Sequence, residues 1–183
     1  IDSGVNGVCP LGSTGEIQYL SLDARRQITE ICIDQAAGRV PVLPGIAAHS
    51  TTDAVDQARS MAEAGADGIV AIQQLYYPVP TSGVIDFFTA IADATSLPVV
   101  LYTNPKLGGR IPFEAIVELA EHPNIIAYKD AHGITGHLLS VRQAVGDKLA
   151  LFAASAHVPA FVFEIGGAGW MAGPACLAPR AAV

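Results

Sequence analysis

Apolar positions along this chain follow two alternating patterns. Short runs in which nearly every residue is apolar predict buried strands at 7–11, 40–46, 68–72, 98–102, 125–129, 149–153 and 169–171. Between them, apolar residues recur with helical spacing, which predicts amphipathic helices at 23–37, 52–64, 82–94, 112–121 and 136–145. Ser21 is placed to cap the first of these helices, and Pro112 fits the first turn of the fourth.

The order of these elements predicts an α/β fold. Strands that alternate with helices form parallel sheets with right-handed crossovers, and strands apolar on both faces suit a sheet covered by helices. So many strand–helix units favour a (β/α)₈ TIM barrel over an open doubly wound sheet, with residues 1–183 as a single barrel domain. Because an incomplete barrel leaves unpaired strand edges, we expect a longer protein whose first strand–helix unit and C-terminal helices lie outside this sequence.

Composition narrows the classes of partner. The net charge of -7 and the lack of a basic stripe argue against binding to nucleic acid. No apolar run reaches the roughly 18 residues that a membrane span needs. Cys9, Cys32 and Cys176 lie far apart in apolar segments without metal-ligand spacing, so we expect reduced, buried thiols, no metal and a cytoplasmic protein.

Lys129 ends the apolar run that begins at Ile125. The C-terminal tip of a barrel strand is where such folds carry their chemistry, and burial lowers the pKa of a lysine until its amine can attack a carbonyl. A lysine that extends from a strand end into water is the alternative, and this residue alone does not decide between them.

Three motifs precede this strand in the sequence. Residues 12–16, Gly-Ser-Thr-Gly-Glu, offer either backbone donors for a carboxylate or phosphate, or merely a tight turn. Residues 76–80 read Tyr-Tyr-Pro-Val-Pro, and residues 101–105 read Leu-Tyr-Thr-Asn-Pro. A tyrosine at a strand tip can transfer protons, but it can also be a packed aromatic.

Taken together with the apolar-Lys-Asp sequence at the end of the fifth predicted strand, these motifs resemble the dihydrodipicolinate synthase/N-acetylneuraminate lyase family of class I aldolases. The resemblance covers essentially the whole chain. It implies that Lys129 forms a Schiff base with a 2-oxo acid, usually pyruvate, and that Tyr102 moves protons to and from the imine. No cofactor and no metal is implied.

The resemblance also implies roles for residues around this pair. Ser13 and Thr14, with Gly15 in the same loop, would bind the carboxylate of the oxo acid and relay protons. Tyr77 would complete the relay, in the family usually across a dimer interface, so we expect a homo-oligomer built as a dimer of dimers. The main chain of Met171 would line the pocket.

Departures from the family pattern concern the second substrate. True dihydrodipicolinate synthases carry an arginine where this chain has Leu107. The arginine that follows in this chain, Arg110, lies three residues further along. The leucine resembles the neuraminate lyase branch, but the acidic motif after the seventh strand of that branch is replaced by residues 154–157, Ala-Ser-Ala-His. His132 and His157 are the polar groups left to contact a substrate, although lone histidines are more often loop residues with internal partners.

These observations predict a Schiff-base lyase or aldolase that acts on pyruvate or a related 2-oxo acid. The reaction stays open among aldol cleavage, aldol condensation and dehydration of a 2-keto-3-deoxy acid. Alternatives are 4-hydroxy-tetrahydrodipicolinate synthase, which Leu107 disfavours, a non-catalytic relative that binds a 2-oxo acid, and an inactive barrel fragment. The presence of the full set of catalytic residues argues against a protein that only binds its ligand: Lys129, Tyr102, Ser13 and Thr14.

Overall fold

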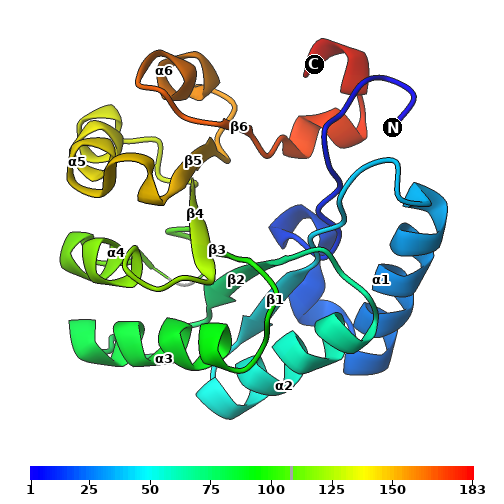
Figure 1. Cartoon of the computed structure of the whole chain (residues 1–183), viewed down its shortest axis with the longest axis horizontal. Coiled ribbons are helices and arrows are strands. Elements are labelled where there is room, and N and C mark those ends of the chain that lie inside the picture. The colour runs from blue at the N-terminus through cyan, green and yellow to red at the C-terminus, as the bar shows by residue number, and fades with distance from the viewer. Residues whose placement is uncertain (108) are drawn as a thin grey trace.

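The computed structural model describes residues 1–107 and 109–183. Its strands form one parallel sheet in chain order: β1 Gly45–Ala48, β2 Ile69–Gln73, β3 Val99–Thr103, β4 Ile125–Asp130, β5 Ala150–Ala153 and β6 Gly169–Trp170. The α-helices are α1 Leu22–Ala36, α2 Thr51–Glu63, α3 Thr81–Asp93, α4 Phe113–Leu119, α5 Thr135–Val145 and α6 Pro159–Glu164. In Figure 1 the helices form an arc around the outside of the curved sheet, and the two termini lie near each other.

The predicted α/β organisation is confirmed, with differences at the first two predicted strands and at one short helix. The expected strand at 7–11 is reduced to a single parallel bridge between Val8 and Val42. The next strand begins only at Gly45, because Pro10, Pro41 and Pro44 lack the N–H groups that a regular ladder needs. Helix α6 has six residues, too few to show a helical period in the sequence.

The helix starts follow from capping chemistry. The Ser21 hydroxyl accepts a hydrogen bond from the Ala24 amide at 3.2 Å, as predicted, and Ser50 caps α2 in the same way. Pro112 differs slightly from expectation, since it is the N-cap of α4 and lies one residue before the first turn. None of the described helices combines the length and apolar character needed to cross a bilayer.

Two apolar layers flank the sheet. The larger lies between the sheet and the helices and includes Leu101 and Ile125. The smaller lines the inner face and includes Val100, Tyr102 and Ala127. Successive residues of β3 therefore alternate between the layers, as the period of a strand requires.

Strand β4 breaks this alternation at one residue. Val99 pairs with Ile125 but Val100 pairs with Ala127, so Ile126 is left out of the register and is 44% exposed. A bulge of this kind exchanges the two faces of the strand beyond it. Tyr102 consequently pairs with Lys129, and both side chains belong to the inner face.

A buried polar network fixes the outer helices to β1. The Arg25 guanidinium donates to Gln57 Oε1 at 2.7 Å and to the Ala47 carbonyl at 3.3 Å. Gln57 also bonds both backbone groups of Ala47. Burial lowers the pKa of Arg25. Each of these buried polar groups therefore has a partner. Their hydrogen bonds hold α1 and α2 against strand β1.

The backbone of Gly45 packs closely against the backbone of Leu11, which leaves no room for a side chain. A methyl group there would collide with the Leu11 carbonyl, so we expect Gly45→Ala to destabilise the fold by about 1–3 kcal/mol. Gly136, in α5, has open space around it, and Gly136→Ala is the matched control, expected to be neutral or stabilising by up to about 1 kcal/mol. Urea unfolding midpoints measure both changes, and equal midpoints for the two variants would contradict the contact.

Candidate active site

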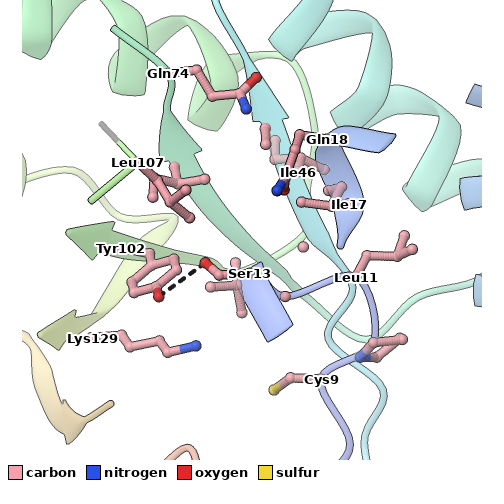
Figure 2. A pocket seen from close by; sticks show the side chains of 16 residues that line it. Cys9, Leu11, Ser13, Ile17, Gln18, Ile46, Gln74, Tyr102, Leu107 and Lys129 are labelled. Carbon is pink, nitrogen blue, oxygen red and sulfur yellow. Dashed lines mark hydrogen bonds between the residues drawn. The ribbon is translucent and has the colours of Figure 1, made fainter. Parts of the chain in front are cut away.

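A pocket opens on the inner face of the sheet, where the C-terminal ends of β3 and β4 meet the loop before α1. It holds about 420 Å³, part of which is open solvent. Figure 2 shows its polar end, formed by Ser13, Tyr102 and Lys129, with Leu107 as an apolar wall beside them. The short 3₁₀ helix Ser13–Gly15 supplies the first of these residues, and strands supply the next two.

Lys129 is the charged group of this pocket. Its residue is only 9% exposed, and its Nζ lies 4.1 Å from the centroid of the Tyr102 ring. No acidic side chain of the described residues forms a salt bridge with it. Burial lowers the pKa of Lys129, and the neighbouring thiol of Cys9 acts in the opposite direction with a smaller effect. The environment therefore favours the neutral amine, which is the nucleophilic form.

The Tyr102 hydroxyl is held by two polar neighbours. It lies 3.2 Å from Ser13 Oγ, and it accepts a hydrogen bond from Asn104 Nδ2 at 2.9 Å. Because Asn104 donates, the proton of the Tyr102 hydroxyl remains available to Ser13 or to a ligand. The sequence analysis did not select Asn104, although it lies inside the Leu-Tyr-Thr-Asn-Pro motif, two residues after Tyr102.

The opposite face of β4 fixes the strand end that carries Lys129. Asp130 is fully buried and accepts hydrogen bonds from the Tyr128 hydroxyl at 3.2 Å and the Gly133 amide at 2.7 Å. Burial, with Asp130 adding to it, raises the pKa of Tyr128 well above the usual range. The residues on both sides of Lys129 are thus anchored toward the helices, and Lys129 itself points inward.

His132 and His157 do not line this pocket. His132 Nδ1 lies 3.5 Å from Asp130 Oδ1, behind the strand, and burial lowers the pKa of His132 although Asp130 opposes this. His157 lies against Gly133. Arg110 borders a separate depression together with Ile111. None of these three residues reaches the polar end of the pocket.

Four further predicted site residues lie outside the lining. Gly15 uses its amide within the turn, donating to the Gly12 carbonyl at 3.0 Å, and Thr14 is exposed near Gly173. Tyr77 is 73% exposed and packs edge-on against Tyr76. Met171 packs against the inner apolar layer. The pocket lining thus includes Ser13, Tyr102, Leu107 and Lys129, and it does not include Thr14, Gly15, Tyr77 or Met171.

The pocket also contains side chains that the sequence analysis did not select for it. Gln18 and Gln74 line it, and so does Cys9. The expectation of buried thiols is wrong for Cys9 and Cys176, which are exposed, while Cys32 is half-buried. In residues 1–107 and 109–183, no group of three or more His, Cys, Asp or Glu side chains is arranged to hold a metal ion.

Comparison with known proteins places this geometry in a family. Residues 1–182 match the dihydrodipicolinate synthetase family. The chain is 36% identical to a 4-hydroxy-tetrahydrodipicolinate synthase of Methanospirillum hungatei, over 98% of this chain and 62% of that protein. The chain therefore spans somewhat less than two thirds of the length of such relatives.

Solved structures agree with the sequence match. The chloride-inhibited dihydrodipicolinate synthase from Acinetobacter baumannii, complexed with pyruvate, superimposes with a TM-score of 0.95 at 29% identity, covering 99% of this chain and 62% of that one. YagE from E. coli K12, also in complex with pyruvate, gives a TM-score of 0.94 at 31% identity, covering 100% and 63%. These matches confirm the TIM-barrel fold class and the resemblance drawn from the loop motifs: the chain belongs to the dihydrodipicolinate synthetase family.

Proposed function

We propose that this protein is a Schiff-base lyase or aldolase that acts on pyruvate or a related 2-oxo acid. The observation that carries the proposal is the environment of Lys129, which is buried at a strand tip, has no acidic partner among the described residues and faces a pocket. Relatives whose crystal structures contain pyruvate support the same class of substrate.

The chemistry begins with the neutral amine of Lys129. It attacks the C2 carbonyl of the 2-oxo acid to give a carbinolamine, and loss of water then leaves an imine. The protonated imine withdraws electrons from C3, so a C3 proton can leave or a C3–C4 bond can break, with the electron pair moving toward nitrogen. Either step leaves an enamine, which takes a proton at C3 to become an imine again. Hydrolysis of that imine after C3–C4 cleavage releases pyruvate and restores the amine.

Tyr102 and Ser13 transfer the protons of these steps. Lys129 Nζ lies 4.1 Å from the centroid of the Tyr102 ring, and the Tyr102 hydroxyl contacts Ser13 Oγ at 3.2 Å, so a proton can pass along the Tyr102–Ser13 pair. The substrate carboxylate binds at Ser13 and at the neighbouring Thr14 of the same loop, and the main chain of Met171 closes the far side. Leu107 contacts the apolar part of the substrate.

We further propose that the protein is a homo-oligomer, a dimer of dimers, in the cytoplasm. The exposed Tyr76–Tyr77 pair supports an interface, because large aromatic side chains are enriched where proteins associate. Tyr77 then completes the proton relay in a neighbouring subunit. The three free cysteines support a reducing compartment.

The second candidate is 4-hydroxy-tetrahydrodipicolinate synthase, the activity for which the curated relatives are named. That reaction joins pyruvate to aspartate semialdehyde, which carries a carboxylate. In this pocket, Leu107 cannot pair with that group, and a missing polar partner discriminates strongly between substrates. We therefore rank this activity below cleavage of a 2-keto-3-deoxy acid.

Borohydride trapping tests the role of Lys129. Incubation with pyruvate and borohydride, followed by peptide mass mapping, is expected to place the adduct on Lys129, and Lys129→Arg is expected to abolish it because a guanidinium stays protonated. Since its pKa is lowered, Lys129 keeps more neutral amine at a given pH, so trapping is expected to persist to lower pH than for an ordinary lysine. An adduct on Lys106 or Lys148, or none at all, refutes the assignment.

Deuterium exchange at the methyl group of pyruvate, followed by NMR in D₂O, isolates the proton-transfer step from the choice of second substrate. We expect Tyr102→Phe to slow exchange by about 10²–10⁴-fold while leaving the pyruvate concentration for half-maximal trapping nearly unchanged. The exposed Tyr19 provides the control, and Tyr19→Phe is expected to exchange at the wild-type rate. Wild-type exchange in Tyr102→Phe would mean that Tyr102 only packs.

A further inference from the structure

Asn104 contacts the hydroxyl of Tyr102, and the reaction steps proposed above give it no role. It directly follows β3 and lies two residues after Tyr102, so the two side chains leave the chain on the same side. Asn104 is half-buried, and its Nδ2 donates to the Tyr102 hydroxyl at 2.9 Å. The same hydroxyl lies 3.2 Å from Ser13 Oγ, a contact drawn as a dashed line in Figure 2.

A backbone hydrogen bond fixes which end of the Asn104 amide faces Tyr102. Asn104 Oδ1 accepts from the Lys106 amide at 3.0 Å. A flipped side chain would turn its NH₂ group toward this backbone N–H, so that two donors would face each other. The Nδ2 group is therefore held toward Tyr102, and the tyrosine oxygen meets a donor rather than an acceptor.

The segment that carries Asn104 is held by further hydrogen bonds. The Leu107 amide donates to the Asn104 carbonyl at 3.1 Å, and Asn104 forms an antiparallel bridge with Gly109. The Thr103 hydroxyl donates to the Gly109 carbonyl at 3.1 Å and accepts from the Ile111 amide at 3.2 Å. The loop thus sets the position of the Nδ2 donor relative to Tyr102 without any contribution from a ligand.

These bonds give the proton of Tyr102 a single direction. Because the Tyr102 oxygen accepts from Asn104, its own proton points to Ser13 or to a ligand. When that proton moves to C3 of the enamine, the O–H bond breaks, a C–H bond forms, and the electron pair stays on the Tyr102 oxygen. The Asn104 N–H already faces the negative charge that develops there, and donors placed in advance in this way lower the barrier.

We propose that Asn104 is a positioning residue that directs the Tyr102 proton toward the substrate and stabilises the negative charge that develops on the Tyr102 oxygen. It acts through Tyr102 and carries no proton itself. This inference rests on the proposed Schiff-base function and adds to it a residue that controls the proton-transfer step.

Two substitutions remove the donor in different ways. Asn104→Asp keeps the oxygen that accepts from the Lys106 amide, but a carboxylate cannot donate to Tyr102, whereas Asn104→Leu removes the donor without adding a charge. We expect both to slow deuterium exchange into the methyl group of pyruvate by about 10- to 100-fold, the loss that corresponds to one hydrogen bond to a charged group. The pyruvate concentration for half-maximal trapping on Lys129 is expected to stay nearly unchanged, which also shows that both variants fold.

A matched control and a double-mutant cycle separate positioning from packing. Asn6→Asp makes the same chemical change at an exposed asparagine and is expected to exchange at the wild-type rate. Because Asn104 acts through the Tyr102 hydroxyl, adding Asn104→Asp to Tyr102→Phe is expected to leave the residual exchange rate nearly unchanged. A purely structural effect would instead multiply with that of Tyr102→Phe.

Three results would overturn the inference while wild-type protein still traps pyruvate. They are wild-type exchange in both Asn104 variants, a full additional loss in the Tyr102→Phe background, and loss of trapping in both variants, since Asn104 would then hold the pocket together rather than direct a proton. Failure of wild-type protein to trap pyruvate would instead overturn the proposed function, and this inference with it.

Discussion

The active site depends on a single residue of β4, Ile126, that has no register partner in β3. Ile126 interrupts the register between β3 and β4, so Ile125 faces the helices whereas Ala127 and Lys129 face the inside of the sheet. In a regular strand, residues 125, 127 and 129 would share a face, and Lys129 would point into the helix layer. The bulge therefore decides that the lysine meets Tyr102, its register partner, in the pocket.

Burial of this lysine is stabilised from the opposite face of the strand. Tyr128 and Asp130, which flank Lys129, bond each other and the Gly133 turn inside the helix layer, so the strand end cannot easily rotate. The amine, which forms no salt bridge with the other described residues, is thereby kept in a poorly solvated place, where its neutral form is favoured. Tyr128 and Asp130 thus fix the strand on its helix-facing side, while Lys129, between them, faces the pocket on the other side.

The helices, the strands and the residues in the motifs could be predicted from the sequence. The bulge in β4 and the positions of the loop side chains could not. Helical spacing located the long helices to within a residue or two, and the apolar run ending at Lys129 located β4. The bulge at Ile126 could not be predicted, because parallel strands are apolar on both faces and a slip leaves no trace in the pattern. Asn104, Gln18 and Gln74 were missed because their positions depend on loop geometry, which has no period.

The central claim is that the register of β4 presents Lys129 to a 2-oxo acid inside the barrel. A crystal structure of the protein reduced with borohydride in the presence of pyruvate tests it most directly. We predict continuous density from Lys129 Nζ to C2 of the reduced pyruvate, on the inner face of the sheet, with the carboxylate beside Ser13 and the Tyr102 hydroxyl next to the new bond. Density on another lysine, or a Lys129 side chain directed between β4 and the helices, would contradict the account.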